Sequence, residues 1–212
     1  PMRWKPATEG GQRLSAANLP TNMLCGLVLL AGELGVNCEG WFAGMRLNVQ
    51  EIHDPLVRVS YRQASEVIRR ALPTLPVEGV GLAMGGKQNG GNFGLLGLAM
   101  KTAPTFGDAV QIGLEYQRNL GPLMDLSLDE RHDGAIAVIA TAPDEASDLL
   151  PFLCEEMFSS VLMLARELAG PDFNPLRLDL GYAPPAYSAR YEELFHCEVR
   201  FNQPQHAMTV DR

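Results

Sequence analysis

The sequence predicts an α+β protein in which helices cover one face of an antiparallel sheet. Three observations support this fold class. Apolar residues recur at three- and four-residue spacing over most of the first 120 residues, which is typical of amphipathic helices. Apolar and polar residues alternate from residue 124 onward, which is typical of strands with one exposed face. A long apolar stretch between these strands has the length of a helix that can cover the sheet.

The N-terminal half is predicted to be helical after a polar, aperiodic tail at residues 1–18. Thr105 precedes an apolar-periodic segment, and residues of this type cap helices at their N-termini. Thr21 or Asn22 is expected to cap the first helix in the same way. Helices are therefore expected at residues 21–35, 39–45, 60–72, 93–101 and 105–120.

The C-terminal half is predicted to supply the sheet. Alternating segments at 124–129 and 135–141 flank an Asp133-Gly134 turn, a pattern that favours a β-hairpin. Residues 19–212 are predicted to form one domain, because no repeat, linker or low-complexity stretch divides them. A sheet of four to five strands is expected, with later strands at 176–181, 198–201 and 207–210, a helix at 144–168 and a short helix after Pro184-Pro185.

Composition and charge exclude several classes of protein. With 46% hydrophobic and 20% charged residues the chain is predicted to be globular rather than disordered. Lys and Arg number 17 against 25 Asp and Glu, so the net charge is 17 − 25 = −8. This net negative charge disfavours a basic surface that binds the phosphate backbone of a nucleic acid. The longest apolar run, 23–31, is too short to span a membrane, so no membrane contact is expected.

Residues 79–97 are unusually rich in glycine. The string from Gly81 to Lys87 matches the front of a nucleotide P-loop, but Gln88 stands where a Ser or Thr would hold Mg²⁺. The surrounding pattern also lacks the required strand and helix. A loop whose glycines permit positive φ or close helix packing is the favoured interpretation.

No pattern indicates catalysis or metal binding. The four cysteines lack the close spacing of zinc ligands, no serine lies in a nucleophile elbow, and the four histidines are expected in loops and the C-terminal part. Glu155 and Glu156 are adjacent on the predicted long helix, where they diverge by ~100°, so a solvated face is expected rather than acid–base chemistry. The chain is predicted to be no enzyme and to need no cofactor or metal.

Aromatic and methionine residues among the predicted helices are candidates for a ligand pocket. Small-molecule sites combine an apolar wall with a few convergent polar groups. Trp41, Tyr61 and Tyr116 offer a polar atom on an aromatic body, and arginines lie close to them in the sequence. The ligand-binding candidates are Trp41, Arg46, Tyr61, Phe93, Met100 and Tyr116.

The predicted long helix at 144–168 carries more apolar residues than one core needs. A fully buried central helix explains this pattern as well as a helix shared between the core and a dimer interface. Both interpretations stay open at the level of the sequence.

Several strings resemble a known regulator family. They are Phe-Gly-Leu-Leu-Gly-Leu-Ala at 93–99, Ala-Pro-Thr-Phe-Gly-Asp-Ala at 103–109, the segment 59–72, and Ala-Pro-Pro-Ala-Tyr at 183–187. Together they resemble the N-terminal effector-binding domain of AraC/XylS-type transcriptional regulators. The branch is the one that includes ornithine-utilisation-regulator-like proteins and is often labelled arabinose-binding. The resemblance runs from about residue 20 to the end of the chain.

The resemblance implies a fold closer to haem-NO-binding and phenol-sensing domains than to a cupin barrel, without their haem or zinc. It implies a cytoplasmic homodimer that binds a small organic effector, such as the amino acid ornithine or another metabolite or signal. It gives no reason to expect arabinose. A helix-turn-helix DNA-binding domain is expected beyond residue 212, so contact with DNA would pass through that missing domain.

A second hypothesis is an effector-independent interaction and dimerisation domain of a virulence or quorum-sensing regulator. Binding of a small molecule separates the two hypotheses, because only the first requires it.

Overall fold

The computed structural model describes residues 14–117, 122–132 and 134–211. The chain divides into two compact units, the first ending at Thr74 and the second beginning at Leu75. Of the predicted N-terminal tail, residues 1–13 lie outside the described residues, and Leu14 is buried.

The first unit is helical, as predicted. Its elements are the α-helices α2 (Asn22–Glu33) and α3 (Tyr61–Ala71) and the short 3-10 helices η1 (Glu39–Phe42), η2 (Glu51–His53) and η3 (Leu72–Thr74). Leu24, Leu27 and Leu30 of α2 are buried, as are Val67 and Ile68 of α3. The three- and four-residue spacing that predicted these two helices therefore marks their buried faces.

Thr21 does not cap α2 with its side chain, contrary to expectation. Its hydroxyl donates to the carbonyl oxygen of Ile52 at 2.6 Å instead. The Cys25 thiol, one turn further along, donates to the same carbonyl at 3.1 Å. Both donors thus tie α2 to Ile52, the buried residue of η2.

Ser60 caps α3, which begins where the sequence predicted a helix. Its hydroxyl accepts from the Gln63 backbone N–H at 3.1 Å, and its own N–H donates to Gln63 Oε1 at 2.9 Å. This capping box satisfies donors that the first turn of a helix leaves unpaired. Ser60→Ala should lower the free energy of unfolding by about 1 kcal/mol in urea titrations. Ser60→Asp should retain most of the wild-type stability, because aspartate also caps helices. Equal stability of Ser60→Ala and wild type would contradict the role of the cap.

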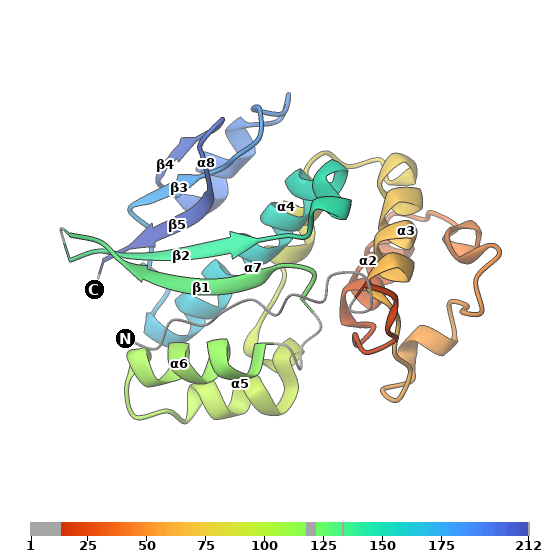
Figure 1. Ribbon diagram of the computed structural model, residues 1–212, viewed down its shortest axis with the longest axis horizontal. Coiled ribbons are helices and arrows are strands. Elements are labelled where there is room, and N and C mark those ends of the chain that lie inside the picture. The colour runs from red at the N-terminus through yellow and green to blue at the C-terminus, as the bar shows by residue number, and fades with distance from the viewer. Residues whose placement is uncertain (1–13, 118–121, 133, 212) are drawn as a thin grey trace. The chain divides into compact units, whose positions relative to one another are not determined.

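The second unit contains helices and one sheet (Figure 1). The helices are α4 (Val80–Gly85), η4 (Gly90–Phe93), α5 (Gly94–Lys101), α6 (Phe106–Tyr116), η6 (Asp144–Leu149), α7 (Leu150–Ala169) and α8 (Ala189–Phe195). The strands are β1 (Asp125–Glu130), β2 (Ile136–Thr141), β3 (Arg177–Asp179), β4 (Glu198–Arg200) and β5 (His206–Val210). The α+β fold class, with five strands, is confirmed.

The strand order is β1-β2-β5-β3-β4, and one pair departs from the predicted antiparallel arrangement. β3 and β4 are parallel, whereas the other neighbours are antiparallel. Parallel neighbours need a crossover connection, and α8 supplies it. Helix α7 lies behind the sheet in Figure 1, so the sheet has one helix-covered face.

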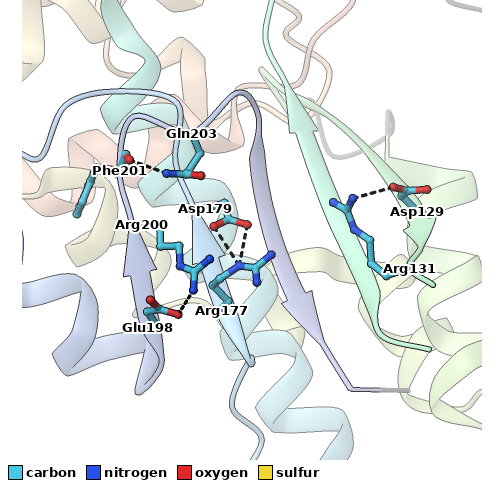
Figure 2. A network of polar contacts seen from close by, with 8 residues as sticks. All are labelled: Asp129, Arg131, Arg177, Asp179, Glu198, Arg200, Phe201 and Gln203. Carbon is cyan, nitrogen blue, oxygen red and sulfur yellow. Dashed lines mark hydrogen bonds and ion pairs between the residues drawn. The ribbon is translucent and has the colours of Figure 1, made fainter. Parts of the chain in front are cut away.

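Alternation along the strands separates two faces of the sheet. Leu178, Met208 and Val138 lie side by side in the register and are buried. Their neighbours along β3, Arg177 and Asp179, belong to the opposite face of the sheet, whose charged side chains are drawn in Figure 2. Burial does not follow this period of two in the centre of the sheet, because Asp179, Ala207 and Thr209 of the opposite face are buried as well.

The predicted helix at 144–168 is two elements rather than one. Residues 144–149 form the 3-10 helix η6, inside which Ala146 has non-helical dihedrals (φ −110°, ψ 17°), and α7 begins at Leu150. Pro151 stands in the first turn of α7, where its missing N–H costs no hydrogen bond. The end of the predicted helix 105–120 and the turn residue Asp133 lie outside the described residues.

The glycine-rich segment is helical where a loop was predicted. Gly79 has φ +62° and precedes α4, which packs against α7. A Cβ atom on Gly81 would lie 2.5 Å from the Phe152 carbonyl oxygen, and one on Gly85 would lie 2.6 Å from the Glu156 carbonyl oxygen. Both roles foreseen for these glycines are therefore present: positive φ at Gly79 and close helix packing at Gly81 and Gly85.

Candidate functional site

A buried carboxylate lies where α4, α7 and α8 meet. Glu155 of α7 is only 2% exposed. Its Oε1 accepts a hydrogen bond from the Tyr191 hydroxyl at 2.5 Å and from the Tyr187 hydroxyl at 2.7 Å. The backbone N–H groups of Gly81 and Leu82 also donate to this carboxylate. All four donors are electrically neutral, so none of them brings a positive charge to this carboxyl group.

Three tyrosines form one connected network on this carboxylate. The rings of Tyr187 and Tyr191 stack with centroids 6.3 Å apart and planes 6° from parallel. The Tyr191 hydroxyl also lies 3.1 Å from that of Tyr182. Tyr191 is fully buried, whereas Tyr187 and Tyr182 are half-buried. The network therefore leads from the buried carboxylate toward the surface through Tyr187.

Gly79 allows Tyr187 to lie over the start of α4. A Cβ atom at Gly79 would be 3.2 Å from Cε2 of the tyrosine ring. The chain just after this tyrosine is also anchored, because Arg190 Nη1 donates to the Glu78 carbonyl oxygen. The segment around Tyr187 is thus fixed to the same turn of chain whose N–H groups reach Glu155.

Burial changes the proton affinity of this cluster. Desolvation raises the pKa of Glu155, and the hydrogen bonds from Tyr191, Tyr187, Gly81 and Leu82 oppose that rise. Desolvation also raises the pKa of all three tyrosine hydroxyls, which stay protonated as donors. A nearby positive charge would favour the ionised form of Glu155.

Glu156, the next residue on α7, is a second carboxyl group that is largely removed from water, and the residue as a whole is half-buried. Desolvation raises its pKa to about 7, opposed by the hydrogen bond that the Ser160 hydroxyl donates to its Oε1 at 3.1 Å. The prediction that Glu155 and Glu156 form a solvated face is therefore wrong. The glycines of α4 explain the difference, because they let α4 cover this side of α7 closely enough to exclude most water.

Comparison with known proteins identifies the chain. Residues 35–212 match the family described as the arabinose-binding domain of AraC transcription regulators, N-terminal. The chain belongs to this family.

Two proteins similar to this AraC-type domain come from Pseudomonas aeruginosa. The chain is 27% identical over 184 residues to an ornithine utilization regulator, a match that covers 87% of this chain and 54% of that protein. The crystal structure of the transcriptional regulator CdpR matches with a TM-score of 0.63 at 17% identity, over 89% of this chain and 54% of that one. The latter match shows a shared fold. The AraC-type domain thus spans about half the length of these relatives.

Three of the six predicted ligand residues lie in the first unit of the AraC-type domain. Trp41 is buried and donates from Nε1 to the Thr74 hydroxyl at 3.1 Å. Tyr61 is buried at the start of α3, and Arg46 is exposed. Arg70, which the sequence did not single out, donates to the carbonyl oxygens of Trp41 and Ala43 and so ties α3 to η1.

The other three predicted ligand residues lie in the second unit. Met100 is buried on α5, and its Cε would lie 2.8 Å from a Cβ atom on Gly113 of α6. Phe93 is half-buried where α5 begins, and Tyr116 is 47% exposed near the end of α6. Phe93 and Met100 thus belong to the packing of α5, whereas Tyr116 is accessible.

The described ranges contain no assembled metal site. Within them, no three His, Cys, Asp or Glu side chains gather as metal ligands would. Burial raises the pKa of Cys25 and Cys154, and that of Cys197 to about 11, so these thiols stay protonated. Among the described helices, none is long and apolar enough to cross a membrane.

The sequence analysis did not predict the hydrogen-bonded network of Glu155 with Tyr182, Tyr187 and Tyr191. Two signals pointed to it. Gly81 and Gly85 are four residues apart, a spacing that leaves one helix face free of side chains. Tyr182, Tyr187 and Tyr191 recur within ten residues of the C-terminal part. Neither signal could place Glu155 between them without the packing of α4 on α7.

Proposed function

We propose that this chain is the ligand-sensing and dimerising part of a bacterial, cytoplasmic AraC-type transcriptional regulator. Its family, its fold and its relatives support this proposal. DNA binding would reside in a part of the whole protein that this chain does not contain. The net charge of −8 supports that division, since a DNA-binding face requires clustered basic residues.

The effector is proposed to be a small molecule with a cationic amine, such as an amino acid of the ornithine type. The observation that carries this proposal is Glu155, a buried carboxylate whose hydrogen-bond donors are all neutral. An ammonium group at this position would offset the cost of keeping the charge out of water. Stacked tyrosine rings beside the carboxylate provide faces that attract a cation.

Tyr187 is the proposed point of entry. It is half-buried, and its hydroxyl is the outer of the two tyrosine donors to Glu155. An amine that takes the place of this hydroxyl reaches the carboxylate without disturbing the buried Tyr191. Movement of Tyr187 would shift the start of α8, and a ligand that binds one position of this segment more tightly changes the population of the two positions.

A thermal-shift panel tests the proposal. Ornithine, lysine and putrescine are compared with their N-acetylated forms, which keep the carbon chain and lose the terminal charge. Binding at one hundred times Kd adds about 2.7 kcal/mol, which for a chain of this size raises the melting temperature by about 5–10 °C. We expect at least one free amine to raise it and its acetylated form not to. Stabilisation by neutral compounds alone would contradict a cationic effector.

The same panel distinguishes effector sensing from the second hypothesis, a domain that dimerises without any effector. No shift with any amine, sugar, polyamine or fatty acid would favour it over effector sensing. No contact in the described residues specifically supports it, so effector sensing remains the proposal.

A further inference from the structure

Arg190 lies beside Tyr187, the proposed entry point of the effector. Its backbone N–H donates to the Tyr187 carbonyl oxygen at 3.0 Å. Such a bond closes a single turn of chain, so the two residues lie close together. The Arg190 guanidinium donates from Nη1 to the Glu78 carbonyl oxygen, and the Tyr187 ring lies over the next residue, Gly79. Both side chains therefore reach the same short segment before α4.

The positive charge of Arg190 has no carboxylate partner within the described ranges. Its hydrogen-bond acceptor at Glu78 is a backbone carbonyl, which is neutral, and Arg190 forms no ion pair with another described residue. A guanidinium carries five N–H donors, so others remain beside the one that contacts Glu78. The side chain is half-buried rather than fully solvated. Arg190 is thus a cation that is held in place next to Tyr187 and can still bind an anion.

Two groups of opposite charge therefore lie near the Tyr187 hydroxyl. Glu155 accepts its hydrogen bond at 2.7 Å. Desolvation and Glu155 raise the pKa of Tyr187, Glu78 raises it further, and Arg190 lowers it, so the charge of Arg190 also acts on this hydroxyl. A small molecule that carries both an amine and a carboxylate can contact Glu155 with the first and Arg190 with the second.

The carboxylate of Glu78 is the competing group, because it would attract a second amine instead of a carboxylate. Its side chain is exposed, and water and salt screen exposed charges. Arg190 is less exposed and is fixed by its hydrogen bond to the Glu78 carbonyl oxygen. We therefore expect Arg190 rather than Glu78 to decide which second charged group the effector carries.

We propose that Arg190 binds the carboxylate of the effector and makes the site select an amino acid over a diamine. The inference rests on the proposed function, because it places the effector's amine at Glu155. Arginine can hold a carboxylate through two parallel N–H···O bonds. An amino acid held at both ends connects α7, through Glu155, with α8, through Arg190. A diamine lacks the second of these contacts.

Calorimetric titration of the 212-residue chain with ornithine and with putrescine tests this selectivity. Putrescine is ornithine without its carboxylate, so the two probes share the carbon chain and both amines. Hydrogen bonds to charged groups are among the stronger ones in proteins. We expect wild type to bind ornithine about tenfold more tightly than putrescine, or better.

Arg190→Gln is expected to raise the dissociation constant for ornithine about tenfold and that for putrescine less than about threefold. Retained putrescine binding also controls for folding, because an unfolded variant binds neither compound. Arg190→Lys keeps the charge without the planar fork and should retain part of the preference for ornithine. Arg200→Gln, on β4, removes the same charge elsewhere in the second unit and should leave both affinities unchanged.

The outcomes separate this inference from the proposed function. Equal affinity of wild type for the two compounds would overturn the role of Arg190, as would an Arg190→Gln variant that weakens both equally or neither. If Glu155→Gln weakens binding of both compounds in that case, the amine site stands without the carboxylate contact. A wild type that binds neither compound would contradict the proposed function itself, and this inference with it.

Discussion

Replacing Gly85 by alanine is expected to lower the free energy of unfolding by about 1–3 kcal/mol. The added Cβ atom would lie 2.5 Å from Ser159 Cβ, 2.6 Å from the Glu156 carbonyl oxygen and 3.0 Å from the Ser160 nitrogen. Two of these are backbone atoms of α7, so the helices must separate rather than a side chain turn aside. The gain in helix propensity from glycine to alanine, up to about 1 kcal/mol, opposes only part of this cost.

Gly81→Ala should behave in the same way, since its Cβ atom would meet the Phe152 carbonyl oxygen and Glu155 Cβ at 2.5 Å. Gly32→Ala is the matched control. Gly32 is also a helical glycine, in α2, and nothing lies within 4 Å of its Cβ position, so this substitution should stabilise by up to about 1 kcal/mol. Urea unfolding of the three variants measures the effects. A stabilised Gly85→Ala would contradict the close packing of α4 on α7.

Glu156→Gln is expected to stabilise the protein at neutral and alkaline pH. Because burial raises the pKa of Glu156 from its ordinary 4.5 to about 7, the folded state holds a proton that the unfolded state releases between these values. The stability of the wild type therefore falls as the pH rises from about 4.5 to about 7 and then levels off. The whole difference corresponds to at most about 3 kcal/mol. Glutamine keeps the acceptor for Ser160 and removes the charge.

The measurement is the difference in unfolding free energy between Glu156→Gln and wild type at pH 4.5, 6 and 8. We expect a difference that grows with pH across this window. Glu155 also has a raised pKa and contributes in the same direction, but it is present in both proteins and cancels to first order. Glu193→Gln, on the exposed side of α8, removes the same charge and should show little change. A difference that is constant with pH would contradict the desolvation of Glu156.

Local signals in the sequence predicted most of the elements. Thr105 caps α6 as its residue type predicts. The period of two placed all five strands within a few residues. These features depend on contacts between residues close in the chain, so the sequence carries them directly.

What the sequence could not supply depends on contacts between distant segments. The parallel pair β3–β4 follows from how α8 returns to the sheet. Burial of Glu155 follows from the glycine face of α4, which lies some seventy residues earlier in the chain. The sequence pattern favours a solvated carboxylate on an apolar helix because most carboxylates are solvated. Only the packing of the two helices reverses that interpretation.

The candidate ligand residues also show what the sequence can predict and what only the three-dimensional packing reveals. Trp41, Tyr61 and Met100 have aromatic or apolar side chains suited to a pocket, and they are buried within the units that hold them. Residue type alone does not separate a pocket wall from a packed core. The Glu155 network differs in having a buried carboxyl group whose hydrogen-bond donors are all neutral, and that property is visible only in three dimensions.

A calorimetric titration of the chain with ornithine, on wild type and on Glu155→Gln, tests the central claim most directly. The proposal predicts saturable binding to wild type and a dissociation constant at least tenfold higher for Glu155→Gln, with Glu193→Gln unchanged. Circular dichroism of the same samples confirms that the variants are folded. Equal affinity of wild type and Glu155→Gln would contradict the claim that this buried carboxylate receives the effector's amine.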